Sequence, residues 1–286
     1  MADARCPAAC GELIQGWILG GEKLISCPID WYSHVSVTEG TPQANERPLM
    51  RQMVNLILEY LGEPAELSNN LCIEFESTIP VAKGMASSTA DIAATAKATA
   101  KLLGKPLNND AIAQLCVKLE PTDSTIFDQL TLFDHQNAQT RISFLWQPEI
   151  DILLLESPLL LRTEDYHRLN REKLLLNQSD NLAKSWQQFL LAEKHQDCYQ
   201  LGAAATSSAI ASQTLLPKPQ FQQLINLAEH SGIYGLNVAH SGSVVGLLLD
   251  RHRHDVDYLR WSLAQEPMAK HYPQLHLVKM TTGGVR

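Results

Sequence analysis

The hydrophobic residues of this chain recur with two spacings, one typical of strands and one typical of helices. Apolar and polar residues alternate in four short segments, which predicts half-buried strands. These segments are residues 35–38, 71–76, 142–146 and 275–280. Two further segments, 152–155 and 244–249, are uninterrupted apolar runs that end at charged residues. Such runs are typical of strands that are covered on both faces.

Helical spacing of apolar residues fills much of the remaining chain. The predicted helices cover residues 52–61, 91–103, 109–119, 166–176, 181–195 and 220–230. The first is followed by Gly62 and then Pro64, and the second by Gly104 and then Pro106. Glycine and proline commonly terminate helices in this order. The pattern therefore predicts a mixed chain in which strands and helices do not alternate strictly.

The order of the predicted elements changes near residue 150. Before residue 150 the predicted order is strand, strand, helix, strand, glycine-rich turn, helix, helix and strand. After it the order is strand, a long helical stretch, helix, turn, strand, helix and strand. A chain of 286 residues suffices for one large or two modest domains. We expect two α+β domains, residues 1–150 and 151–286, with a cleft between them.

Composition and charge narrow the classes of function. The net charge of −8 argues against nucleic-acid binding, which depends on lysines and arginines that neutralise phosphates. No apolar run reaches the length of a membrane span, and the first residues lack the build of a signal peptide, so we expect no membrane partner and a cytoplasmic location. The six cysteines are scattered and none forms a C-x-x-C pair, which favours reduced thiols over disulfides or a zinc site.

The segment PVAKGMASSTA, residues 80–90, places small and hydroxyl-bearing residues just before an alanine-rich helix. A helix N-terminus has unpaired N–H donors and a partial positive charge, and both favour a bound phosphate. Gly84 permits a positive φ, and Ala86 leaves room for a phosphate. The same small residues also suit a helix that packs tightly on a sheet and is capped by serine or threonine. No Walker pattern occurs in the chain, so residue chemistry alone leaves both interpretations open.

The same segment resembles the second signature of the GHMP kinases, P-x-x-x-G-L-x-S-S-A. Met85 stands in place of the leucine and Thr89 in place of the final alanine. The resemblance implies that this segment binds the phosphates of ATP. The residues concerned are Pro80, Val81, Ala82, Lys83, Gly84, Met85, Ala86, Ser87, Ser88 and Thr89.

The other two signatures of the family have counterparts in the expected order. They are CPAACGELIQG at residues 6–16 and VAHSGSVVGLLL at residues 238–249. In the first, Glu12 and Gln15 replace the usual polar residues; in the third, His240 and Ser241 stand where glycines are commoner. The three segments together span nearly the whole chain.

This resemblance implies a fold and an activity. The fold is an N-terminal domain like that of ribosomal protein S5, with an unusual left-handed crossover, and a ferredoxin-like C-terminal domain. The pieces ACGELIQG, CPIDWYS and EPTDS are most similar to the family branch that phosphorylates the side-chain hydroxyl of L-threonine with ATP. The product, O-phospho-L-threonine, serves the aminopropanol linker of adenosylcobalamin. The alternatives are a kinase for another small amino alcohol such as homoserine, or a sensor that binds nucleotide and metabolite without turnover.

Phosphoryl transfer requires positioned phosphates, neutralised charge and an acceptor for the hydroxyl proton. By resemblance, Asp123 accepts or orients this proton, and Ser88 binds Mg²⁺. Glu120 is a second candidate magnesium ligand or else a solvated carboxylate at a helix end. Lys83 is a candidate phosphate contact or else a solvent-facing lysine. His135 has no partner at catalytic spacing and is interpreted as a surface or packed residue.

An amino-acid substrate carries an ammonium and a carboxylate group, and each needs a partner in the protein. Glu12 and Gln15 are the candidates for the ammonium group, and Tyr32 is a candidate wall of the same pocket. His240 and Ser241 are candidate hydrogen-bond donors to the carboxylate. These residues make up the predicted substrate site.

Overall fold

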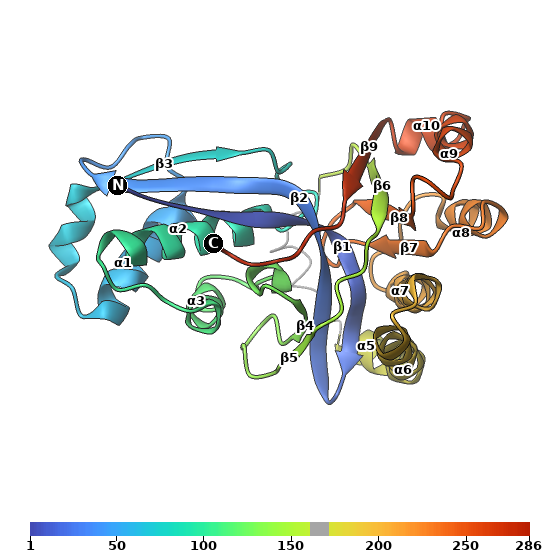
Figure 1. Cartoon of the computed structure of the whole chain (residues 1–286), viewed down its shortest axis with the longest axis horizontal. Coiled ribbons are helices and arrows are strands. Elements are labelled where there is room, and N and C mark those ends of the chain that lie inside the picture. The colour runs from blue at the N-terminus through green and yellow to red at the C-terminus, as the bar shows by residue number, and fades with distance from the viewer. Residues whose placement is uncertain (161–171) are drawn as a thin grey trace.

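The computed structural model of the chain describes residues 1–160 and 172–286, and the nine strands in this part form one antiparallel sheet (Figure 1). The strand order is β5-β4-β2-β1-β7-β8-β6-β9, and β3 pairs with β2 beside this path. The strands are β1 (Ala2–Ile18), β2 (Gly21–Glu39), β3 (Leu71–Ser77), β4 (Leu130–Phe133), β5 (Arg141–Phe144), β6 (Asp151–Glu156), β7 (Gly235–Val238), β8 (Val245–Leu249) and β9 (Gln274–Lys279).

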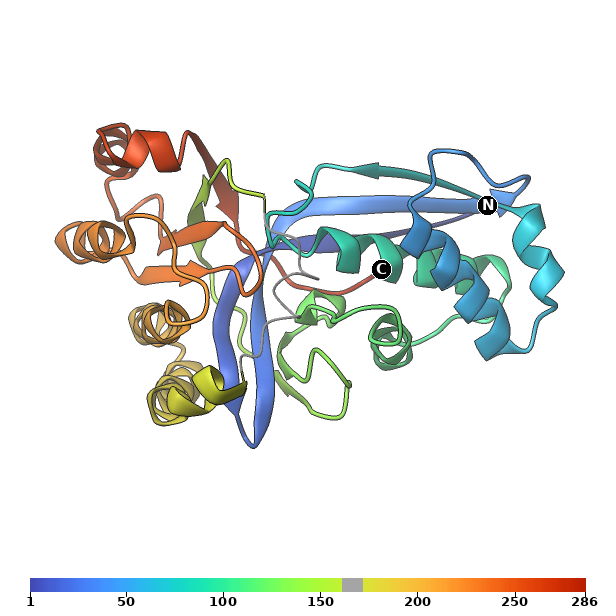
Figure 2. The same ribbon diagram turned by 180° about the vertical axis from the view of Figure 1, so that it is seen from behind.

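The helices gather at the two ends of this sheet. Those at the first end are α1 (Pro48–Leu61), α2 (Ser87–Leu102) and α3 (Asn109–Cys116), with the 3-10 turns η1 (Ala65–Asn70) and η2 (Ser124–Ile126). Those at the second end are α5 (Glu172–Asn177), α6 (Ser179–His195), α7 (Cys198–Ser212), α8 (Phe221–His230), α9 (Val256–Leu263) and α10 (Met268–His271). Figures 1 and 2 show the two groups on opposite sides of the centre. Among the described helices, none is long and apolar enough to cross a membrane.

The β1–β2 hairpin connects the two ends of the molecule. Near the N-terminus, β2 pairs with β3, whereas farther along the hairpin Leu24 pairs with Phe133 of β4. On the other side, Glu12 of β1 pairs with Val238 of β7. The register of the hairpin shifts between Ala9 and Glu12, and such an irregularity bends a strand and redirects its side chains. This bend lies where the functional residues gather.

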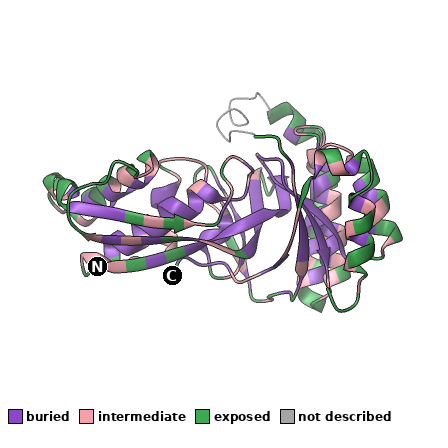
Figure 3. Ribbon diagram, turned by 90° about the horizontal axis from the view of Figure 1, so that it is seen from above, coloured by how far each residue is buried: buried purple, intermediate pink, exposed green. Residues whose placement is uncertain are grey.

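Helix α2 is buried on nearly all sides, and its small residues explain why. It packs on β1 and β2 and lies between α1 and α3. Its alanines, including Ala90, Ala94 and Ala98, are fully buried, so the helix can approach the sheet closely. Figure 3 shows buried residues along the strands and on inner helical faces, and exposed residues on the outer helical faces. The packing interpretation of the alanine-rich segment is therefore correct for the body of the helix.

One hydrophobic core runs through both ends of the chain. It joins residues of α1–α3 to Leu182 and Trp186 of α6 and to Ala204 of α7, all around the β1–β2 hairpin. A second, smaller core lies between β6–β9 and helices α8–α10. The C-terminus also returns to the first half, since the N–H of Arg286 donates to the carbonyl of Arg5 at 3.0 Å. The division into residues 1–150 and 151–286 stays a prediction, and both segments contribute to the larger core.

Most of the predicted elements are confirmed. The six predicted strands correspond to β2, β3, β5, β6, β8 and β9, and the predicted helices to α1, α2, α3, α5, α6 and α8. Residues 166–171 of the fourth predicted helix lie outside the described residues. The sequence pattern does not predict helix α7 or strands β4 and β7, and it gives no range for β1, which spans 17 residues.

Candidate active site

The irregular part of strand β1 and two turns from distant parts of the sequence meet at the bend of the hairpin. The N–H of Ala9 in β1 donates to the carbonyl of Met85 at 3.1 Å, and the N–H of Ser243 donates to the carbonyl of Lys83 at 3.0 Å. A Cβ atom on Gly84 would lie 2.6 Å from the Cα of Gly242, which shows how closely these turns pack. Only glycine fits at this contact. The three predicted signature segments are therefore neighbours in space.

The predicted phosphate segment forms a tight turn that leads directly into α2. Ala82, Gly84 and Ala86 all have positive φ, at 60°, 75° and 59°. Helix α2 then begins at Ser87. Two alanines in the left-handed region cost about 1–2 kcal/mol each, and such strain is typical of turns whose shape is required for binding. The first residues of α2, Ser87, Ser88 and Thr89, line a cavity, and the first N–H groups of a helix have no partner within the helix.

This cavity has a volume of about 350 Å³ and contains most of the predicted site. Its walls include every residue of the predicted phosphate segment except Lys83. Among the other predicted residues, it is lined by Glu12, Glu120, Asp123, His240 and Ser241. Phosphate-binding and substrate-binding candidates thus share one cavity.

Asp123 is directly connected to the phosphate turn. The hydroxyl of Thr89 donates to Oδ2 of Asp123 at 3.2 Å, and the backbone N–H of Asp123 donates back to that hydroxyl at 3.2 Å. Burial raises the pKa of the Asp123 carboxyl, while the bond from Thr89 and the nearby His240 lower it. Thr89 therefore fixes the position of the candidate proton acceptor relative to α2.

Glu12 faces the same cavity as a buried carboxylate. Its side chain is 3% exposed, and Oε2 has no hydrogen-bond partner within the described part of the chain. Burial raises the pKa of Glu12 well above its ordinary value, and Asp123 raises it further, while the backbone N–H of His240 and the ammonium of Lys218 lower it. A cation bound between Glu12 and Asp123 would stabilise the ionised forms of both.

Gln15 contacts His240 rather than the cavity. Its Nε2 donates to the carbonyl of Val238 at 2.9 Å, so its Oε1 faces Nδ1 of His240, also at 2.9 Å. Nε2 of His240 lies 3.2 Å from Oε1 of Glu22. Gln15 therefore orients His240, and a direct contact of Gln15 with substrate stays a prediction that this arrangement does not favour.

Lys83 and Tyr32 lie away from the cavity. The ammonium of Lys83 donates to the carbonyl of Ser157 and lies 3.6 Å from the carboxylate of Glu156. A phosphate contact would require Lys83 to leave these partners. The ring of Tyr32 is covered by the guanidinium of Arg5 at 4.8 Å and is not among the cavity walls.

Two supporting residues could not be identified from the sequence. Lys218, between α7 and α8, is 6% exposed and donates to the carbonyl of Gly242 at 2.7 Å, and burial lowers its pKa to about 7. Arg47 pairs with the buried Asp91 of α2 and donates to Oγ of Ser87 at 3.3 Å. Neither lies near a signature segment in the sequence, so only the folded chain brings them there.

Comparison with known proteins agrees with this geometry. Residues 48–133 match the family model described as GHMP kinases N terminal domain. The chain is 59% identical to the L-threonine kinase of Citrobacter freundii over 285 residues, which covers 100% of this chain and 99% of that protein. The chain belongs to the GHMP kinase family. This GHMP kinase is also 59% identical to the L-threonine kinase of Salmonella typhimurium, with 100% and 95% of the two chains covered.

A solved structure shares the fold of this GHMP kinase at low sequence identity. The mevalonate diphosphate decarboxylase from Enterococcus faecalis, in a study of its ATP binding, superposes with a TM-score of 0.69 at 17% identity, covering 100% of this chain and 99% of that one. The α+β GHMP kinase fold expected from the sequence is thereby confirmed. The protein is a kinase, and the cavity described above is its candidate active site.

Proposed function

We propose that this GHMP kinase transfers the γ-phosphoryl group of ATP to the side-chain hydroxyl of L-threonine, giving O-phospho-L-threonine and ADP. The 59% identity to two L-threonine kinases over nearly their full lengths supports this reaction. Within the site, the observation that best supports an amino-acid substrate is the buried Glu12 carboxylate, which lines the cavity together with Asp123. An ammonium group is the natural partner for such a carboxylate.

The turn at residues 80–89 would bind the phosphates of ATP through main-chain donors. The N-terminus of α2 supplies N–H groups and a partial positive charge, and Gly84 and Ala86 give the turn its shape. The hydroxyls of Ser87 and Ser88 line the same cavity and add donors. This mode of binding explains why the segment needs few basic side chains.

Asp123 would receive the proton of the substrate hydroxyl. The hydroxyl oxygen attacks the γ-phosphorus, the bond from that phosphorus to the bridging oxygen of ADP breaks, and the proton passes to the carboxylate of Asp123. The raised pKa of Asp123 makes it a better proton acceptor than an exposed aspartate. Thr89 would keep this carboxylate in line with the phosphate turn.

Ser88 and Glu120 are the residues that would hold a magnesium ion. Both line the cavity, and both offer the oxygen donors that this ion prefers, so the residues present fit it. When bound, Mg²⁺ neutralises charge on the β- and γ-phosphate oxygens.

The test is a comparison of kcat/KM for L-threonine, L-serine and L-homoserine with ATP and Mg²⁺, with the phosphorylated product identified by mass spectrometry. We expect L-threonine to exceed L-serine by ~10-fold or more, because a methyl group that fits an apolar wall contributes about 1–3 kcal/mol. A preference for L-homoserine would transfer the assignment to that substrate. Absence of ADP release with all three would favour a sensor.

We further propose that the product serves the aminopropanol linker of adenosylcobalamin and that the reaction is cytoplasmic. The first rests on the resemblance of the N-terminal segment, and the second on six thiols that suit a reducing compartment. Isotope from labelled L-threonine is expected in the linker only in cells that contain the active kinase. Label in the linker of cells without it would contradict the proposed place in metabolism.

A further inference from the structure

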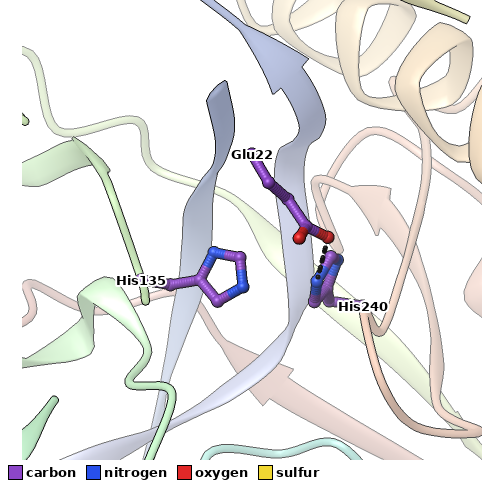
Figure 4. Close-up of side chains that lie close together, drawn as sticks. All are labelled: Glu22, His135 and His240. Carbon is purple, nitrogen blue, oxygen red and sulfur yellow. Dashed lines mark ion pairs between the residues drawn. The ribbon is translucent and has the colours of Figure 1, made fainter. Parts of the chain in front are cut away.

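A second cluster of side chains lies at the edge of the active-site cavity. Glu22, His135 and His240 each offer one ligand atom, and these atoms all lie within 4.8 Å of one another (Figure 4). The two histidines are 2% and 6% exposed, and the Glu22 side chain is 8% exposed. Two imidazoles and a carboxylate form a donor set that binds zinc and other divalent transition metals.

The three residues come from separate segments whose backbones are fixed. Glu22 is paired with Trp17 in the β1–β2 hairpin. The carbonyl of His135 accepts a hydrogen bond from the N–H of Thr122 at 2.8 Å. His240 follows β7 in the turn that packs on Gly84. The cluster is therefore held by the fold rather than by one flexible loop.

The separation of Glu22 and His240 fits two ligands of one metal ion. Nε2 of His240 and Oε1 of Glu22 are 3.2 Å apart. A charge-assisted hydrogen bond between such groups is usually shorter, about 2.7–2.9 Å. Two ligands at about 2.0–2.1 Å from a tetrahedral zinc ion are about 3.3 Å apart. The observed distance is closer to the second arrangement.

The surrounding hydrogen bonds orient Nε2 of His240 and Oε1 of Glu22 for binding a cation. Because the amide of Gln15 is fixed by Val238, its Oε1 accepts from Nδ1 of His240. The lone pair of Nε2 then faces the Glu22 carboxylate unless a proton or a metal ion lies between them. Nε2 of Gln136 donates to Oε2 of Glu22 at 2.7 Å and leaves Oε1 toward the cluster. Ligands held from behind in this way are typical of metal sites.

We propose that Glu22, His135 and His240 bind a divalent transition metal, with zinc as the ion that the donor set fits best. This site is distinct from that of magnesium, because Mg²⁺ prefers oxygen ligands and seldom binds imidazole. His135 and His240 both line the cavity, so a three-residue site leaves a fourth position open toward it.

The experiment measures zinc binding directly, by titration of the metal-free full-length protein and by the visible absorption of bound Co²⁺. One equivalent of Zn²⁺ is expected per chain, with release of protons on binding. His135→Ala removes a ligand and is expected to lower the affinity by ~100-fold or more. Gln136→Ala removes only the support of Glu22 and is expected to lower it by about 10-fold.

His252→Ala is the matched control, because His252 is an exposed histidine that does not belong to the cluster. Its zinc affinity is expected to equal that of the unmodified protein. Failure of the unmodified protein to bind an equivalent of Zn²⁺ would overturn the proposal, as would unchanged affinity in His135→Ala. An equal loss in His252→Ala would also overturn it, by assigning the zinc to the surface. If His135→Ala does not fold, Gln136→Ala and the unmodified protein still decide the question.

Discussion

The candidate active-site cavity has two chemically different groups of lining residues, which we call the turn end and the charged end. The turn end is the segment at residues 80–89, whose shape depends on Gly84 and on alanines with positive φ. The charged end consists of the ionisable residues Glu12, Asp123 and His240, and Asp123 contacts the turn end through the hydroxyl of Thr89. We propose that the turn end recognises its ligand by backbone shape and the charged end by side-chain charge.

This difference predicts different sensitivities to substitution. At the turn, adding a Cβ atom should damage the site more than removing a polar side chain. At the charged end, replacing a carboxylate by an amide of the same shape should weaken catalysis or substrate binding while the fold persists. Carboxylate-to-amide variants at the charged end and glycine-to-alanine variants at the turn end therefore test this comparison.

The largest effect is expected at the charged end, from Asp123→Asn. The amide keeps the shape but cannot accept the hydroxyl proton, so kcat should fall by ~10²–10⁴ with little change in KM for ATP. Steady-state kinetics at saturating L-threonine measure this. Asp128→Asn is the control, because Asp128 is an exposed carboxylate in the same acidic segment that does not line the cavity. Unchanged turnover in Asp123→Asn would remove Asp123 from the chemistry.

The next effect is expected at the turn, from Gly84→Ala. The added Cβ would lie 2.6 Å from Gly242 Cα and 2.8 Å from Ala239 Cβ, and φ at Gly84 is 75°. We expect about 1–2 kcal/mol of backbone strain plus about 1–3 kcal/mol from the clash, with a raised KM for ATP. Chemical denaturation measures the free energy of unfolding.

Gly62→Ala separates these two contributions. Gly62 has a φ of 70°, but a Cβ there would meet nothing within 4 Å. Its cost should therefore be the strain alone, about 1–2 kcal/mol, and its KM for ATP should not change. Equal destabilisation in both variants would mean that the packing of Gly84 on Gly242 contributes little.

A third, smaller effect is expected from Glu12→Gln. The variant loses the charge proposed to bind the ammonium group, so KM for L-threonine should rise about 10- to 100-fold, the loss of one charged hydrogen bond. KM for ATP should stay constant, which is what distinguishes the two ends. A parallel rise in both KM values would contradict the assignment of Glu12 to the amino acid.

Glu12→Gln also has a pH signature in stability. The folded protein raises the pKa of Glu12, so it binds this proton more tightly than the unfolded chain, whose carboxyl has the ordinary value of 4.5. Stability is therefore lost as pH rises from 4.5 through the folded pKa. At pH 8 the variant should have a higher Tm than the unmodified protein, and the difference should shrink toward acid pH.

The turn end of the cavity could be predicted from the sequence more readily than the charged end. Gly84, the small residues after it and the terminating Gly104 carry local conformational signals, and the structure places them as expected. The contacts of Gln15, by contrast, depend on Val238 and His240, more than 220 residues away. No local pattern encodes such a contact, so the direction in which Gln15 points could not be predicted.

The differences from prediction at helix α7 and strand β1 have reasons that the fold makes clear. Helix α7, Cys198–Ser212, is made largely of small residues and is buried between α6 and the sheet, so it lacks the polar face that marks an amphipathic helix. Strand β1 is buried on both faces over most of its length and is interrupted by a change of register. Alternation of apolar and polar residues is absent from such a strand.

The smallest effect is expected from Lys218→Met, at a residue that interacts with the surroundings of both the turn end and the charged end. Its ammonium bonds the carbonyl of Gly242, which packs on Gly84, and its charge lies near Glu12. Lys218→Met keeps the apolar volume but loses this bond. Without this bond the turn is positioned less firmly, and the free energy of ATP binding should weaken by about 0.5–1.5 kcal/mol. This corresponds to a rise in KM for ATP of about 2- to 10-fold.

The pH dependence of stability is an independent test of the environment of Lys218. Burial lowers the pKa of Lys218 from 10.5 to about 7, so between these values the unfolded chain binds more protons and stability rises with pH. Lys218→Met cannot show this rise. Urea unfolding from pH 6 to pH 10 measures the free energy of unfolding of both proteins. The stability of the variant relative to the unmodified protein should therefore be greatest at pH 6. A constant difference across this range would mean that Lys218 titrates normally, and that its ammonium is not confined between the glycine turn and Glu12.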